Sequence, residues 1–224
     1  MERSLLQERI KSLKDQDFEE LALAVFQFQA THNPVYRQYL DLLGVKQTQV
    51  SRLSDIPFLP IQLFKRHQIQ TGSWQAQQVF SSSATTGAVA SQHLVRDSEW
   101  YRQNARQGFE YFYGPLHQYV VLALLPSYLE RSGSSLILMA EDFIEQSDPQ
   151  NGGFYLYEQE ALLTQIEKIS QQTSKRILLL GVSFALLDLA DSYAQAFPEG
   201  TIVMETVGMK GRRKEVTRSE LHRA

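Results

Sequence analysis

Residues 119–125 read Tyr-Val-Val-Leu-Ala-Leu-Leu, an uninterrupted apolar run that decides the fold class of this chain. Shorter runs of the same kind follow, and strands are expected at Tyr119–Leu125, Arg176–Leu180 and Thr201–Glu205. Amphipathic segments predict helices at Ser98–Tyr113, Ser134–Gln146, Glu158–Gln172 and Ser183–Ala196. Strands that alternate with helices are typical of parallel sheets, because each parallel pair needs a crossover connection. The sequence therefore predicts an α/β fold with a largely parallel sheet.

Residues 1–50 have a helical pattern instead, with apolar side chains recurring every three to four positions. The start and end of one helix are clearly indicated. Asn33 suits an N-cap, Pro34 suits the first helical turn, and Gly44 suits a left-handed C-terminal end. The apolar face of this helix is expected to comprise Val35, Tyr39, Leu42 and Leu43. We expect one large domain, with a helical segment at 1–50 and an α/β portion at 51–224.

The segment from Ile56 to Ile61 contains two prolines, which favour an ordered loop over a paired strand. Residues 75–82 and 91–96 are expected to pair as a hairpin around a hydroxyl-rich loop. At the other end, residues 217–220 read Thr-Arg-Ser-Glu, which is the spacing of a capping box. A helix is expected to begin there, and the domain is expected to be cut within it.

Composition excludes several classes of protein. The 224 residues carry 22 Lys and Arg against 25 Asp and Glu, and 43% are hydrophobic, as in a globular protein. The net charge of −3 argues against a nucleic-acid partner. The apolar runs are too short for a transmembrane segment, the N-terminus lacks a signal-peptide pattern and cysteine is absent, so a cytoplasmic location is expected.

Three loops could bind a ligand. Residues 81–87 place five hydroxyls before a glycine, which suits a phosphate but is also typical of a polar turn. Residues 126–135 follow an apolar strand, where α/β sheets hold ligands; the alternative is a connection in which Ser134 only caps the next helix. Residues 205–214 combine two glycines with four cations, which suit an anion or a solvated basic loop. The five histidines have no metal-site spacing, so no metal site is assigned to them.

Taken in order, these segments resemble acyl-protein synthetases, the LuxE-type branch of the adenylate-forming enzymes, which is related to phenylacetate–coenzyme A ligases. The segments that carry the resemblance are Phe80–Gly87, Leu124–Arg131, Gly181–Asp188 and Met204–Arg213, with support from Ile56–Pro60 and Phe64-Lys65. The resemblance covers nearly the whole chain and implies the large domain of that superfamily.

The resemblance also implies an activity and a site. The activity is ATP-dependent conversion of a fatty or aryl carboxylate into an acyl-adenylate, with Mg²⁺ as cofactor and a protein thiol as acyl acceptor. The residues that match nucleotide-binding segments of the family are Ser82, Ser83, Thr85, Thr86, Gly87, Gly208, Met209, Lys210 and Gly211. Those beside the acyl pocket are Pro126, Ser127, Tyr128 and Arg131.

The chain departs from the family pattern at two glycine positions, which hold Ala84 and Val207. It also ends at Ala224, before the Tyr-Gly-Met-Thr-Glu segment, the C-terminal lobe and the acylated cysteine of the family. The catalytic residues are therefore expected beyond Ala224, and this chain is expected to be inactive alone. A second hypothesis is a non-catalytic module that binds an acyl group, a nucleotide or a partner protein.

Overall fold

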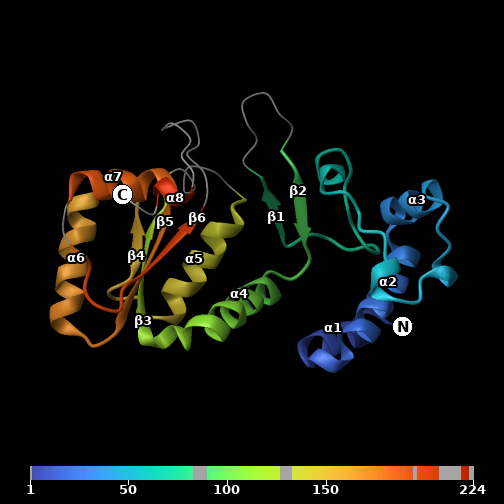
Figure 1. The fold of residues 1–224 in the computed structure, drawn as a ribbon, viewed down its shortest axis with the longest axis horizontal. Coiled ribbons are helices and arrows are strands. Elements are labelled where there is room, and N and C mark those ends of the chain that lie inside the picture. Colours follow the sequence, from blue (N-terminus) through green and yellow to red (C-terminus); the bar gives the residue numbers. More distant parts are fainter. Residues whose placement is uncertain (1, 83–89, 127–132, 194–195, 207–217, 222–224) are drawn as a thin grey trace. The chain divides into compact units, whose positions relative to one another are not determined.

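The computed structural model describes residues 2–82, 90–126, 133–193, 196–206 and 218–221 (Figure 1). The chain divides into two compact units, Met1–Asp97 and Ser98–Ala224. In both units the described residues contain no helix that is long and apolar enough to cross a membrane. Each unit is considered by itself below.

The first unit begins with three helices, α1 (Arg3–Lys11), α2 (Phe18–His32) and α3 (Pro34–Leu42). Short 3-10 turns lie at Asp15–Asp17, Gln47–Gln49, Leu53–Asp55 and Ile61–Lys65. The core of this unit is formed by buried side chains that α2, α3 and the following loop contribute, namely Phe26, Ala30, Tyr36, Leu40 and Val50. The helical character predicted for residues 1–50 is confirmed.

Both ends of α3 match the sequence prediction, and its buried face matches in part. The Asn33 side chain accepts a hydrogen bond from the Tyr36 amide at 3.1 Å, and Gly44 has a φ of 69°. Of the expected apolar face, Val35 and Tyr39 are partly buried and Tyr39 packs against the core, whereas Leu42 is 80% exposed and Leu43 is 50% exposed. The fully buried residues are Tyr36 and Leu40, one position further along, which pack with Phe26 in the core. The Tyr36 hydroxyl donates to the Pro57 carbonyl at 2.7 Å.

The rest of the first unit consists of the proline segment and a hairpin. Residues 56–60 have no regular secondary structure, as predicted. Strands β1 (Gln78–Ser81) and β2 (Gln92–Val95) pair antiparallel, which confirms the predicted hairpin. The ring of Phe64 stacks on the ring of His93 in β2, with 6.0 Å between the ring centroids. The turn at Ile61–Lys65 therefore packs against this hairpin.

The second unit contains a parallel sheet with the strand order β4-β3-β5-β6. Its strands are β3 (Tyr119–Leu124), β4 (Gly153–Tyr155), β5 (Arg176–Val182) and β6 (Ile202–Thr206). Its helices are α4 (Ser98–Tyr113), α5 (Ser135–Gln146), α6 (Gln159–Gln172), α7 (Ser183–Ser192) and the short α8 (Arg218–Leu221), with a 3-10 turn at Leu116–Gln118. The predicted α/β class and parallel sheet are confirmed.

Two predicted details of this unit were wrong. Strand β4 was missed, because three residues that begin with glycine carry too little periodic pattern to indicate a strand. Helix α7 ends at Ser192, before the expected Ala196, because Tyr193 takes an extended backbone with φ −138° and ψ 104°. The predicted helix at 217–220 is present as α8, although its capping residue Thr217 lies outside the described part of the chain.

Helices cover both faces of the sheet (Figure 1). Along β3, Tyr119 and Val121 belong to one buried cluster, which includes Phe109 of α4 and Phe143 of α5. The alternate residues Val120 and Leu122 of β3 belong to a second buried cluster. Side chains of α6 and α7 complete this cluster, among them Leu162, Ile166, Phe184 and Leu189. Burial on both faces explains why β3 is apolar without interruption.

Candidate functional site

The carboxyl edge of the parallel sheet is the candidate site in the second unit. The register places Leu124 of β3 beside Gly181 of β5, and Gly181 beside Glu205 of β6. The chain segments that follow these three strands therefore leave the sheet at the same edge. In open α/β sheets this is the edge at which ligands bind.

A hydrogen bond between two side chains joins β6 to the start of α7. The hydroxyl of Ser183 lies 2.6 Å from the carboxylate Oε1 of Glu205 and 3.2 Å from the carbonyl oxygen of Thr206. Ser183 is only 2% exposed. The hydroxyl donates to the carboxylate, and such charge-assisted bonds are short and strong. This bond holds a carboxylate in a defined position at the carboxyl edge of the sheet.

A glycine allows α7 to pack closely at this edge. An added Cβ at Gly181 would lie 2.6 Å from the Cγ and Cδ2 atoms of Leu186, well inside the normal contact distance. The absence of a side chain therefore lets the first turn of α7 approach β5. This close approach brings Ser183 within reach of Glu205.

Two ionisable groups beside β4 add to the electrostatics of the same edge. The carboxylate of Glu158 accepts hydrogen bonds from the amides of Leu156 at 2.8 Å and Tyr157 at 3.1 Å. These backbone hydrogen bonds lower the pKa of Glu158, so it stays ionised at neutral pH. Burial raises the pKa of the Tyr155 phenol, which stays neutral and can donate a hydrogen bond.

Most of the site residues predicted from the sequence lie outside the described residues. These are Ser83, Thr85, Thr86, Gly87, Ser127, Tyr128, Arg131, Gly208, Met209, Lys210 and Gly211. The structure describes Ser82, in the first unit, and Pro126, in the second. Pro126 is buried directly beyond β3, at the carboxyl edge.

Two hydroxyls from the predicted loops have structural roles. The Oγ atom of Ser82 accepts a hydrogen bond from the Ser91 amide at 3.0 Å, and the Ser82 amide donates to the Ser91 carbonyl at 3.0 Å. Ser82 therefore closes the hairpin, as the polar-turn alternative requires. The Oγ atom of Ser134 accepts from the Ile137 amide at 3.3 Å and caps α5.

Sequence reasoning did not assign a role to Ser183 or Glu205, which are the best-defined polar pair at the edge. The available signal was their position, since Ser183 directly follows the buried run of β5 and Glu205 stands near the end of β6. Polar residues that follow buried parallel strands meet at one edge of the sheet. Their mutual distance could not be read from a separation of 22 residues.

The residues at this edge fit a magnesium ion only in part. Within the described ranges, no group of three or more acidic or histidine side chains could hold a metal ion. Magnesium that is shared with nucleotide phosphates needs only one or two protein carboxylates, and Glu205 is one carboxylate at this edge. The donor set therefore suits magnesium that takes its other ligands from phosphate and water.

The chain was compared with family models and with curated proteins. No family model matches it, and no curated protein matches it. What is established is an α/β fold with a parallel sheet whose carboxyl edge carries the Ser183–Glu205 pair.

Proposed function

We propose that this chain provides the nucleotide- and acyl-binding portion of an ATP-dependent ligase of the acyl-protein synthetase type. Its substrate is a fatty or aryl carboxylate, its product is an acyl-adenylate, and the acyl group then passes to a protein thiol in the cytoplasm. The observation that carries the proposal is the Ser183–Glu205 pair at the carboxyl edge of the sheet. Two of the segments that resemble the family's ligand-binding loops, after β3 and after β6, begin at this same edge. The third, residues 82–87, follows β1 of the hairpin in the first unit.

The proposed reaction requires binding and charge stabilisation more than a protein nucleophile. A carboxylate oxygen of the substrate attacks the α-phosphorus and forms a new P–O bond, which gives a mixed anhydride. Pyrophosphate leaves with the electrons of the P–O bond that breaks. Positioned donors and cations supply most of the rate enhancement in such reactions. Magnesium would offset negative charge on the phosphates when bound.

Each segment has a part in this proposal. The hydroxyls and amides of residues 82–87 bind phosphate, the glycines of 208–211 let the backbone approach the nucleotide, and residues 126–131 border the acyl group. Glu205 contributes a carboxylate oxygen toward magnesium, and Ser183 holds that carboxylate in place. At the end of β4, Glu158 contributes a negative charge and the Tyr155 hydroxyl contributes a hydrogen-bond donor.

One observation favours a second candidate, the non-catalytic binding module. The Oγ atom of Ser82 accepts a hydrogen bond from the Ser91 amide, so this side chain already has a structural role in the hairpin. Ala84 and Val207 also stand at positions where the family has glycine. Such a module would bind an acyl group or a nucleotide without releasing pyrophosphate.

The test is exchange of labelled pyrophosphate into ATP, with magnesium and a panel of fatty and aryl acids. Any longer product of the same gene is assayed beside the 224-residue chain. Carboxylate-dependent exchange is expected in a product that extends beyond Ala224, not in the 224-residue chain. In that longer product, Glu205→Gln should reduce the exchange by about tenfold or more, the loss expected when one electrostatic contact to the reacting phosphates is weakened. Glu141→Gln, an exposed change on α5, is the matched control. Ligand binding without any exchange would favour the binding module.

A further inference from the structure

A groove in the second unit lies on the face of the sheet that α6 and α7 cover (Figure 1). Its volume is about 1250 Å³, and α6, α7, residues 196–198 and β6 form its walls. Apolar side chains make up much of the lining, namely Leu163, Leu186, Leu189, Tyr193, Phe197 and Val203. A helix is about 10 Å wide, so two to three turns fill roughly 850–1,300 Å³. The groove therefore has room for a short stretch of helix.

Strand β6 is covered well on one face and less well on the other. Ile202 packs against the buried cluster that contains Phe109 of α4 and Phe143 of α5. Side chains alternate along a strand, so Val203 points to the opposite face, where it lines the groove and is 46% exposed. Strand β6 is also the last strand in the described sheet. The helical layer that packs on β3 and β5 is therefore incomplete over Val203.

The charged residues that line this groove are two glutamates of α6. Glu160 and Glu167 share one helix face with Leu163 and Ser170, which also line the groove. Seven residues rise about 10.5 Å along a helix, so the two carboxylates stand two turns apart. In the described part of the chain, the ion pairs include neither glutamate, and no lysine or arginine lines the groove. Apolar walls thus occur together with two negative charges on one wall.

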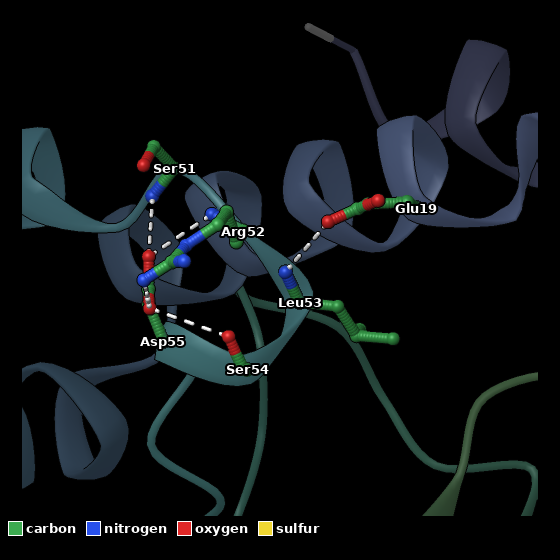
Figure 2. A network of polar contacts seen from close by, with 6 residues as sticks. All are labelled: Glu19, Ser51, Arg52, Leu53, Ser54 and Asp55. Carbon is green, nitrogen blue, oxygen red and sulfur yellow. Dashed lines mark hydrogen bonds and ion pairs between the residues drawn. The ribbon is translucent and has the colours of Figure 1, made fainter.

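An apolar groove of the first unit differs in this respect. Its volume is about 1120 Å³, and α1, α2 and the segment around residues 56–59 contribute to its walls. Beside it, the Leu53 amide donates to the Glu19 carboxylate at 3.0 Å, and the Arg52 guanidinium lies 3.3 Å from the Asp55 carboxylate (Figure 2). These polar groups are used within the unit, so their charges do not indicate an occupant.

We infer that the groove of the second unit docks a basic amphipathic helix of a partner protein. The apolar side of that helix covers Val203 and packs against α7, as in other helix-in-groove complexes. Lysine or arginine residues seven positions apart on it pair with Glu160 and Glu167, because two helices that lie side by side have the same rise per residue. A second copy of this chain fits less well, since a twofold axis would bring the same glutamates together.

This interface goes beyond the proposed ligase activity. It uses the helical face of the sheet, and its formation requires neither ATP nor the Ser183–Glu205 pair at the carboxyl edge. Peptide binding and pyrophosphate exchange are therefore separate measurements, and the failure of one leaves the other standing.

Fluorescence anisotropy with the 224-residue chain and a labelled peptide tests the inference. The probe is an alanine-based helical peptide of about three heptads, with leucine at two positions of each heptad and lysine at a third. The control peptide has glutamate in place of each lysine. The lysine peptide should bind at least about tenfold more tightly, a difference of ~1.4 kcal/mol. Added salt should weaken its binding, because salt screens charges at an exposed interface.

Paired variants locate the interface. Glu160→Lys with Glu167→Lys should reverse the preference, so that the glutamate peptide binds more tightly. Glu141→Lys with Glu145→Lys, an equal change of charge at exposed positions on α5, should leave the preference as it is. Val203→Trp should fill part of the groove and weaken binding of the lysine peptide about tenfold. Val79→Trp, at a 36% exposed valine of β1, is the matched control and should not.

Several outcomes would overturn the inference. Binding of neither peptide, or equal binding of both, would remove the basic helix as the occupant. So would equal effects of the two tryptophan variants when circular dichroism shows that both are folded. Concentration-dependent dimerisation that Val203→Trp abolishes would assign the groove to a second copy of the chain. Loss of peptide binding in any longer product of the same gene would assign it to a further segment of the same chain.

Discussion

The carboxylate of Asp142 on α5 lies 3.3 Å from Nε of Arg106 on α4, and Arg102 of the same helix approaches it at 3.7 Å. Asp142 is only 2% exposed, and among the described atoms its Oδ2 has no hydrogen-bond partner. Burial raises the pKa of Asp142, and the opposing effects of Arg106 and Arg102 do not cancel it. This cluster ties α4 to the helix that begins after the loop at the end of β3.

We predict that wild type loses stability relative to Asp142→Asn as pH rises. The pKa of Asp142 is higher in the folded chain than its unfolded value of about 3.9. The folded state therefore binds the proton more tightly, and this contribution is complete below pH 3.9 and disappears as pH rises through the folded pKa. Urea unfolding of both proteins between pH 3.5 and about 7 measures the difference. The unfolding free energy of wild type minus that of Asp142→Asn should fall as pH rises. If it stays constant or grows, the pKa of Asp142 is not raised.

Gly181→Ala should destabilise the second unit by about 1–3 kcal/mol, because the new methyl group would overlap Leu186. Leu186→Ala in the same protein should restore part of the loss. Gly108→Ala on α4 is the matched control, since a Cβ there has no neighbour within 4 Å. That change should stabilise the chain by roughly 0.5–1 kcal/mol, because alanine is the better helix former. Thermal unfolding compares the three variants, and equal effects of the two glycine changes would refute close packing at Gly181.

Ser183→Ala should cost about 1.5–3 kcal/mol of unfolding free energy, because it removes a buried donor to the Glu205 carboxylate. Ser192→Ala, on the same helix, removes an exposed hydroxyl that bonds the Asp188 carbonyl and should change stability by less than about 0.5 kcal/mol. Chemical denaturation gives both values. Similar losses in the two variants would mean that the Ser183–Glu205 bond contributes little.

Thr85→Val and Thr86→Val should each weaken ATP binding by roughly 10- to 150-fold if the hydroxyl-rich loop binds phosphate. Valine keeps the shape of threonine and removes the donor, and a hydrogen bond to a charged group contributes about 1.5–3 kcal/mol. Thr164→Val on α6 is the control, because its hydroxyl bonds the Glu160 carbonyl within its own helix. Unchanged ATP affinity in the loop variants would assign this segment to a hairpin turn alone.

Sequence reasoning succeeded where the determinants are local. The apolar run at 119–125 and its successors predicted three of the strands and the parallel sheet, because a strand buried on both faces must be apolar throughout. Asn33 and Gly44 predicted the ends of α3, because capping depends on residues within one turn. The same local pattern identified only part of the helix face that packs, and it missed the three-residue strand β4.

By itself, then, the sequence determined which segments are helices and strands and the class of fold that they form. The tertiary structure decided which side chains meet. Tyr36 is buried in the cluster with Phe26 and Leu40, where its hydroxyl bonds the Pro57 carbonyl, 21 residues further along the chain. Ser183 meets Glu205 because parallel pairing of β5 with β6 aligns their carboxyl ends. Backbone and capping preferences act over one turn or a few residues, whereas contacts between distant segments depend on how the packed elements are arranged.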